Sequence, residues 1–203
     1  MCEEGCMLPI SCPPLTIRDW QLHDLAPYRR WLQPGQRWQS LDGPYYRTST
    51  SHAQIDAKVD ALREQIDEGQ WPTPRTRMPI AYDATDTLIG LVSWYWISEE
   101  TDWPAVGIVL FDPAHWGRGL GYTALGHWCA YVFGALPQIV RLDIQTWSGN
   151  HGMMRLATKL GFREEGRFRK ARIVEGAYYD AMGYGILREE WDARHAGVFG
   201  PPR

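Results

Sequence analysis

A glycine-rich turn at residues 116–123 is the part of this sequence best suited to bind a phosphorylated ligand. It reads Trp-Gly-Arg-Gly-Leu-Gly-Tyr-Thr and lies between an apolar run, residues 106–111, and a segment with helical spacing of apolar residues. Glycine lets consecutive backbone N–H groups turn toward one centre, and the following helix adds unpaired donors and the positive end of its dipole. The turn therefore predicts a site for a diphosphate.

Two common nucleotide motifs fit this turn poorly. No GxxxxGK[ST] sequence is present, which excludes a P-loop. Gly119-x-Gly121-x-x-Ala124 matches a dinucleotide pattern, with Asp143 downstream as the ribose-binding acid. However, residues 112–115 separate the strand from the turn, and Asp143 falls inside an alternating strand instead of at its C-terminal end. The dinucleotide interpretation is therefore the weaker one.

The turn resembles motif A of the GNAT superfamily of acyl-CoA-dependent N-acetyltransferases, (Q/R)-x-x-G-x-(G/A), here Trp116-x-x-Gly119-x-Gly121. Farther on, residues 146–150, ending in Asn150, and a following Leu-Gly-Phe at 160–162 resemble the family's motif B. The segments 164–167 and 176–187 are similar to the last two strands of the RimJ/RimL-like branch, whose named members acetylate protein N-termini. The resemblance covers residues 15–191.

The resemblance implies an α/β (α+β) GNAT fold: a mixed, mostly antiparallel sheet of about seven strands, splayed between strands 4 and 5, with flanking helices. Apolar periodicity indicates the same order of elements, including a helix at 52–68 stopped by Gly69 and an earlier helix capped by Asp19. We expect a leader without order at 1–14, one acetyltransferase domain at 15–192 and a C-terminal tail at 193–203.

The resemblance also implies which residues bind acetyl-CoA. The strand before the turn offers backbone groups to the pantetheine arm. The turn binds the pyrophosphate with help from a positive charge and a hydroxyl. The helix of motif B supplies an amide near the sulfur and a cation for the 3′-phosphate. These residues are Val109, Leu110, Phe111, Trp116, Gly117, Arg118, Gly119, Leu120, Gly121, Tyr122, Thr123, Asn150 and Arg155. By residue type alone, Asn150 is equally a helix cap and Arg155 a solvated surface residue.

The catalytic groups are less well marked. Trp116 replaces the Gln or Arg of motif A, and Ala157 stands where many members have the tyrosine that protonates the leaving thiolate. We expect Ser148, near the sulfur, or Tyr179, near the last strand pair, to take that role, and Glu99 to relay the proton of the amine. Each has an ordinary alternative, since serine before a helix is commonly a cap and loop carboxylates are commonly solvated.

Composition agrees with a soluble cytoplasmic enzyme. The 203 residues are 44% hydrophobic, no apolar run approaches the ~20 residues of a membrane span, and the acidic N-terminus does not resemble a signal peptide. A net charge of −3 argues against nucleic acid as a partner. The spacing of Cys2, Cys6 and Cys12, without a nearby histidine, differs from that of a zinc site, so we expect free thiols and no metal. A homodimer is a family-level expectation.

The sequence therefore predicts transfer of acetyl from acetyl-CoA to a primary amine by direct attack in a ternary complex. A protein or peptide N-terminal amine is the favoured acceptor, and a small amine such as a polyamine, amino acid or antibiotic is the alternative. With Ala157 in the tyrosine position, a catalytically weak CoA-binding sensor is a third interpretation. Trp94 and Trp96 alternate on one strand and either wall the acceptor cavity or belong to the core.

Overall fold

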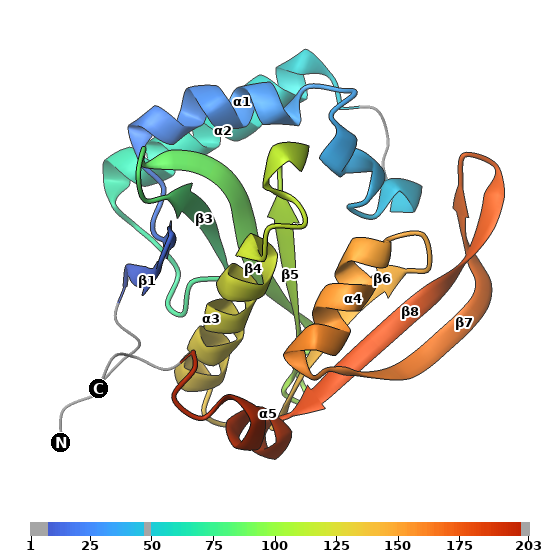
Figure 1. The fold of residues 1–203 in the computed structure, drawn as a ribbon. Coiled ribbons are helices and arrows are strands. Elements are labelled where there is room, and N and C mark those ends of the chain that lie inside the picture. Colours follow the sequence, from blue (N-terminus) through green and yellow to red (C-terminus); the bar gives the residue numbers. More distant parts are fainter. Residues whose placement is uncertain (1–7, 47–49, 200–203) are drawn as a thin grey trace, which may run out of the picture.

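The computed structural model describes residues 8–46 and 50–199. Its centre is one sheet of eight strands in the order β1-β2-β3-β4-β5-β6-β8-β7. The strands are β1 Ile10–Cys12, β2 Leu15–Ile17, β3 Arg77–Tyr82, β4 Thr87–Ser98, β5 Trp103–Leu110, β6 Arg141–Trp147, β7 Arg163–Val174 and β8 Ala177–Leu187. Figure 1 shows β7 and β8 as a long hairpin that projects at one edge of the sheet. The predicted mixed, mostly antiparallel sheet is confirmed, with one strand more than the sequence indicated.

The sheet splits between β5 and β6. These strands run parallel and pair at Ala105 and Asp143, whereas every other pair of neighbouring strands in the described chain is antiparallel. Beyond Ala105, β5 stays paired with β4 as far as Leu110, and β6 stays paired with β8 as far as Trp147. The predicted splay between the fourth and fifth strands is thus present, and the additional strand β1 shifts its numbering by one.

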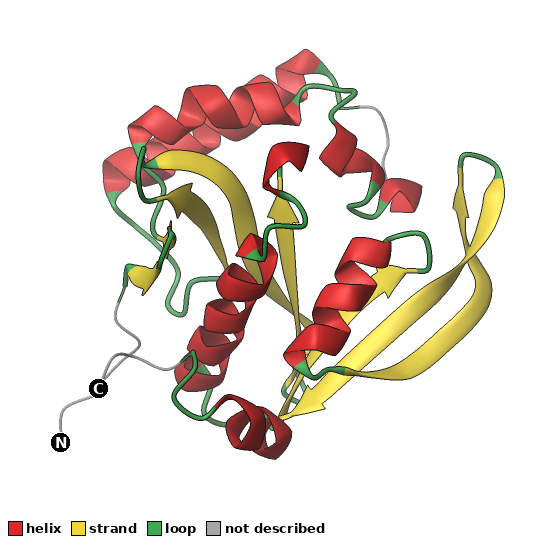
Figure 2. Cartoon of the chain, in the orientation of Figure 1, coloured by secondary structure: helices red, strands yellow, loops and turns green. Residues whose placement is uncertain are grey.

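Helices cover both faces of the sheet and enclose two apolar cores (Figure 2). On one face lie α1 Leu25–Leu32 and α2 His52–Glu68, and on the other lie α3 Leu120–Ala135 and α4 His151–Leu160, with α5 Arg188–His195 at the end of the chain. Short 3-10 turns are η1 Leu22–Asp24, η2 Arg37–Ser40, η3 Pro44–Tyr46 and η4 Pro113–His115. The central strands β3, β4 and β5 are therefore largely buried, whereas β7 at the edge of the sheet is mostly exposed.

Local chemistry explains one predicted helix and corrects another. For α2, the Ser51 hydroxyl accepts from the Gln54 N–H at 3.2 Å and the Gln54 amide oxygen accepts from the Ser51 N–H at 2.8 Å. Gly69, with φ 63°, ends this helix in the left-handed region, as predicted. Asp19 does not cap α1, because its carboxylate accepts from Arg75 at 2.8 Å, and the chain forms the turn η1 before α1 begins.

Both ends of the described chain are more ordered than we expected. Within the expected leader, β1 pairs with β2 and buries Cys12, and this burial raises the pKa of its thiol to about 12. Cys129 is also a free, buried thiol, whereas Cys2 and Cys6 lie outside the described residues. Within the expected tail, Phe199 packs so closely on α3 that a Cβ at Gly126 would collide with its ring.

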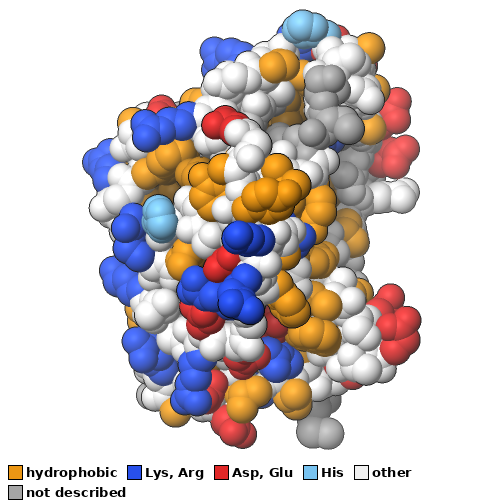
Figure 3. Space-filling view, turned by 90° about the vertical axis from the view of Figure 1, so that its right-hand side faces the viewer, with side chains coloured by type: hydrophobic (Ala, Val, Ile, Leu, Met, Phe, Trp, Pro, Cys, Tyr) orange, Lys and Arg blue, Asp and Glu red, His pale blue; other side chains and the backbone are white. Residues whose placement is uncertain are grey.

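On the side of the β7–β8 hairpin, the surface has no large patch of a single charge, positive or negative. Figure 3 shows basic, acidic and hydrophobic side chains mixed on this face. The hairpin has three exposed large apolar side chains, namely Phe168, Ile173 and Tyr178. Across the two described ranges, the helices are all too short or too polar to cross a membrane.

Candidate active site

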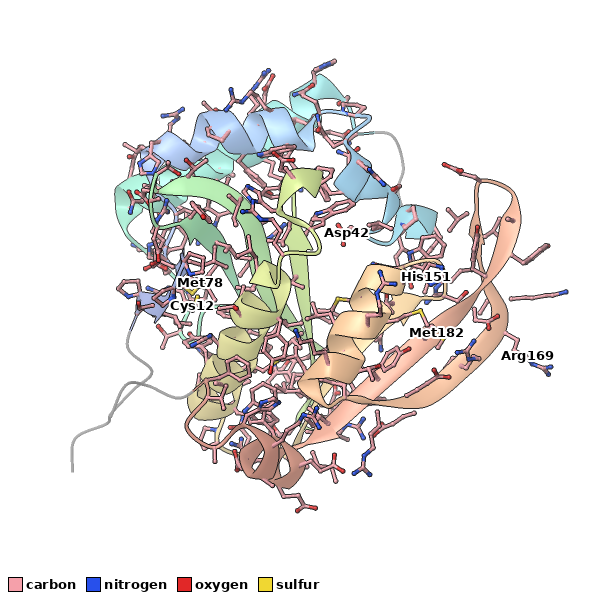
Figure 4. All side chains as sticks on the ribbon, in the orientation of Figure 1. Cys12, Asp42, Met78, His151, Arg169 and Met182 are labelled. Carbon is pink, nitrogen blue, oxygen red and sulfur yellow. The ribbon has the colours of Figure 1, made fainter. Side chains whose placement is uncertain are left out.

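A cavity of about 1040 Å³ occupies the split between β5 and β6. Its walls come from the C-terminal half of β5, the end of β6, the glycine turn, α4, the η2–η3 segment and the β7–β8 hairpin. Asp42 of the η2–η3 segment, His151 at the start of α4 and Met182 of β8 are among its lining residues and are labelled in Figure 4. The volume is at the upper end of the usual range for ligand pockets, roughly 300–1,000 Å³. The cavity can therefore hold a long cofactor together with a second substrate.

The glycine turn forms the expected cradle at one end of the cavity. The Trp116 N–H donates to Pro113 and the Tyr122 N–H donates to Gly119, each at 3.0 Å, but the N–H groups of residues 117–121 between them have no partner within the described chain. Gly117 and Gly119 have φ values of 71° and 85°, which turn these groups toward one side without a Cβ penalty. A run of free donors at the start of α3 fits a diphosphate.

Trp116 replaces the polar residue of motif A without disturbing the turn. Its indole N–H donates to the carbonyl oxygen of Leu110 at 2.9 Å, and the guanidinium of Arg37 lies 5.5 Å from the centre of its ring. The indole therefore fastens the turn to the end of β5. Trp116, Gly117, Gly119, Gly121 and Tyr122 line the cavity. The other turn residues expected to bind the cofactor are not part of its lining: Arg118 is exposed, Leu120 is buried in the core and Thr123 is half-buried.

The open edge of β5 offers backbone groups to the cavity. The Phe111 N–H donates to Ile89 of β4 at 2.9 Å. Because hydrogen-bonded and open pairs alternate along antiparallel strands, the peptide groups of Val109 also point to β4, while those of Ile108 and Leu110 point into the split. Of the three expected strand residues, Leu110 presents its peptide N–H and C=O to the split. Val109 lines the cavity, but its peptide groups point to β4, and Phe111 is buried in the core.

The N-terminal end of α4 forms the facing wall. The Asn150 side-chain oxygen accepts from the Met153 N–H at 3.0 Å, which caps the helix, and the Asn150 amide donates to the Leu41 carbonyl at 3.1 Å. Arg155 lines the cavity, and one turn later the ammonium of Lys159 lies 4.5 Å from the ring of Tyr122. Asn150 is thus both a cap and a cavity residue. The two cations lie on the side of the cavity that faces the glycine turn.

The expected catalytic residues fall in three different settings. The Ser148 hydroxyl accepts from the Asp180 N–H at 3.0 Å, next to the cavity but not in its lining. The ring of Tyr179 packs edge-on against Trp147, 4.7 Å between centres, just behind the cavity wall. Glu99 is exposed in the turn between β4 and β5. This turn precedes the N-terminal part of β5, where β5 and β6 are still paired, so the structure does not bring Glu99 to the cavity. Ala157 is fully buried and packs in the core.

A polar group from distant parts of the chain lines the other half of the cavity, and sequence reasoning missed it. It consists of Asp42, Tyr45 and Tyr46 from the η2–η3 segment, Arg77 from β3, Ser93 and Tyr95 from β4, and Arg172 from β7. Burial raises the pKa of Tyr95 and, despite the nearby Arg172, also that of Tyr45. Both phenols therefore stay protonated at neutral pH and can donate hydrogen bonds.

The tryptophans of β4 belong to the core. Trp94 is buried among the residues under α3, and Trp96 packs against it with 5.1 Å between ring centres. The opposite face of β4 carries Ser93 and Tyr95, which line the cavity. Aromatic walls are instead provided by Trp38, Trp116 and Trp147. No three His, Cys, Asp or Glu side chains converge as a metal site would require, in the parts of the chain that the structure describes.

Comparison with known proteins places the chain in a family. Residues 14–163 match the family model "Acetyltransferase (GNAT) domain". A relative in Bacillus subtilis, the SPbeta prophage-derived uncharacterized N-acetyltransferase YokL, is 26% identical over 181 residues, covering 89% of this chain and 94% of the relative.

Two solved structures show the same fold. The spermidine N-acetyltransferase from Vibrio cholerae in complex with CoA and spermine has a TM-score of 0.68 at 22% identity, over 88% of this chain and 98% of that one. The ribosomal-protein-S5-alanine acetyltransferase from Vibrio fischeri has a TM-score of 0.68 at 17% identity, over 91% and 99%. At these identities the likeness establishes the fold and leaves the acceptor open.

Proposed function

The chain belongs to the GNAT acetyltransferase family, and we propose that its acceptor is the α-amine of a peptide or protein N-terminus. As a GNAT N-acetyltransferase it is an acetyl-CoA-dependent acyltransferase. The cradle of unbonded N–H groups, the open edge of β5 and the cations on α4 together fit that co-substrate. The acceptor is the part of the function that we propose.

The observation that carries the proposal is the charge of the polar half of the cavity. Asp42 is the one carboxylate among the described residues that line the cavity, and it shares this half with Arg77 and Arg172. A polyamine carries two or more positive charges, and its desolvation requires several acidic partners. A peptide amine brings one positive charge, and its neutral backbone suits a wide cavity lined by hydroxyl and aromatic groups. This balance favours a peptide over a polyamine.

The residues divide the chemical work as follows. When bound, acetyl-CoA supplies the activated acyl group. One of the two open N–H groups of β5, that of Ile108 or that of Leu110, donates to the thioester carbonyl oxygen and polarises it, and the other is available to the pantetheine arm. Asp42 attracts the ammonium form of the acceptor and takes its proton, which frees the nitrogen lone pair to attack the carbonyl carbon. As the C–S bond breaks, the departing thiolate takes a proton from Ser148 or Tyr179, whose hydroxyl groups adjoin the end of β6 just outside the cavity lining.

One competition assay tests the proposal. Release of CoA is measured with N-terminal peptides, polyamines, amino acids and aminoglycosides at equal concentration. We expect peptides to have the highest kcat/KM. A small amine with kcat/KM at least roughly tenfold above every peptide, a gap of about 1.4 kcal/mol, would overturn it. Retention of CoA without release by any amine would instead identify a binding module.

A further inference from the structure

Arg172 of β7 is a partly buried cation with no carboxylate beside it in the described chain. One terminal nitrogen donates to the Tyr46 hydroxyl at 3.1 Å and the other donates to the Ala171 carbonyl at 3.3 Å. Its Nε is buried without a partner, and the guanidinium lies 4.5 Å from the ring of Tyr45. Since Arg172 lines the cavity, its remaining N–H groups adjoin the space for the acceptor.

The other arginines that are at least partly buried in the described ranges all have anions or several carbonyls as partners. Arg18 pairs with Asp24 and Asp86, Arg75 with Asp19, and Arg141 with Asp143 and Glu165, while Arg188 donates to the carbonyls of Phe133, Leu136 and Ile139. A guanidinium withdrawn from water without an anion is unfavourable. Arg172 departs from this pattern, and it does so in the wall of a substrate cavity.

A second guanidinium lies in the same half of the cavity. Arg77 pairs with Ser93 across β3 and β4, and Ser93 pairs with Gly107 across β4 and β5. These residues form a row on one face of the sheet, at the level where β5 and β6 separate. The side chain of Arg77 is exposed, lines the cavity and makes no hydrogen bond or ion pair with any residue that the structure describes. The acceptor half therefore contains two cations without anions and, in Asp42, one carboxylate.

We propose that the acceptor carries a carboxylate a few bonds from its amine, and that Arg172 binds this carboxylate. The inference rests on the proposed function, because it takes the polar half of the cavity to hold an α-amine. The amine end meets Asp42, and the forked donors of Arg172 match a carboxylate. The carboxylate is the side chain of an acidic residue next to a peptide N-terminus, or the α-carboxylate of a free amino acid.

The test compares acceptors that differ in one charge. kcat/KM is measured by CoA release with the amidated peptides Ser-Glu-Ala-Ala, Ser-Gln-Ala-Ala and Ser-Lys-Ala-Ala, with free serine and serinamide as a second pair, and with spermidine. We expect the Glu peptide to exceed the Gln peptide by roughly tenfold to a hundredfold, the usual range for a hydrogen bond to a charged group, and the Lys peptide to be the poorest.

Variants of Arg172 assign the effect to this side chain. Arg172→Gln should lower kcat/KM for the Glu peptide to the level of the Gln peptide, Arg172→Lys should restore part of the difference, and Arg172→Glu should favour the Lys peptide. Arg169→Gln is the matched control, because Arg169 is on the same strand, points away from the body of the protein and does not line the cavity (Figure 4). CoA affinity, measured by calorimetry, should be unchanged in all four variants.

The outcomes separate this inference from the proposed function. Equal kcat/KM for the three peptides together with no preference of serine over serinamide, or an undiminished preference in Arg172→Gln, would refute the inference and leave peptide acetylation standing. A preference for serine over serinamide with no peptide turnover would support the carboxylate at Arg172 and refute the peptide acceptor. Spermidine with kcat/KM at least roughly tenfold above every peptide, or CoA binding without turnover, would refute both.

Discussion

Replacing Gly121 with valine is expected to abolish CoA binding while the protein stays folded. Gly121 is in the first turn of α3 and lines the cavity, and its N–H is among those without a partner in the described chain. A branched side chain there would occupy the space of the diphosphate. A hydrogen bond to a charged group contributes roughly 1.5–3 kcal/mol, so losing two would cost about 3–6 kcal/mol, or roughly 10²- to 10⁴-fold in Kd.

The fold should tolerate this change. A Cβ on Gly121 would meet the nearest atom of Leu156 at 3.6 Å, an ordinary van der Waals contact, and φ at this position is not in the left-handed region. Valine is also a slightly better helix former than glycine. Gly134→Val, in the exposed last turn of the same helix, is the matched control. Calorimetry with CoA and thermal unfolding decide the matter, and a folded Gly121→Val variant with undiminished affinity would refute the diphosphate assignment.

Three further results are expected. Ser148→Ala or Tyr179→Phe should lower kcat by about 10²-fold or less with little effect on the Kd of CoA; wild-type rates in both variants would leave solvent as the acid. Asp42→Asn should lower kcat by at least about 10²-fold in the same assay, and an unchanged rate would move the base elsewhere. Phe199→Ala should lower the free energy of unfolding by about 3 kcal/mol in denaturant titrations, because the ring fills the space over Gly126; a loss below about 1 kcal/mol would contradict this packing role.

The glycine turn and its unbonded N–H groups could be predicted from the sequence because they are local. The glycine turn is a run of consecutive residues at the start of a helix, so its N–H groups converge through local geometry alone. The position of the split could likewise be inferred, since the two motifs follow the two strands that separate. Val109 and Phe111 differ from expectation because hydrogen-bond alternation along β5 depends on its pairing with β4, which a single strand does not reveal.

The polar half of the cavity could not be predicted because four separate elements contribute to it. Asp42 and Arg172 are far apart in sequence, and the contact between Arg172 and Tyr46 is made only when the β7–β8 hairpin reaches the η2–η3 segment. On β4 the alternation correctly places Trp94 and Trp96 on one face, but helices cover both faces of the sheet, so hydrophobicity does not tell which face lines the cavity. For that reason the sequence did not identify Tyr95 as a cavity residue, although it lies between these tryptophans and faces the other side of the sheet.

The two halves of the site are joined at one carbonyl group. The Leu41 oxygen accepts from the Trp147 indole at 3.2 Å and from the Asn150 amide at 3.1 Å, so both donors come from the junction of β6 and α4. Asp42 follows directly in the chain. The residue that caps α4 therefore also holds the segment that carries Asp42. Since the same helix faces the glycine turn, the Leu41 carbonyl connects the segment that carries Asp42 to the wall of the cavity opposite that turn.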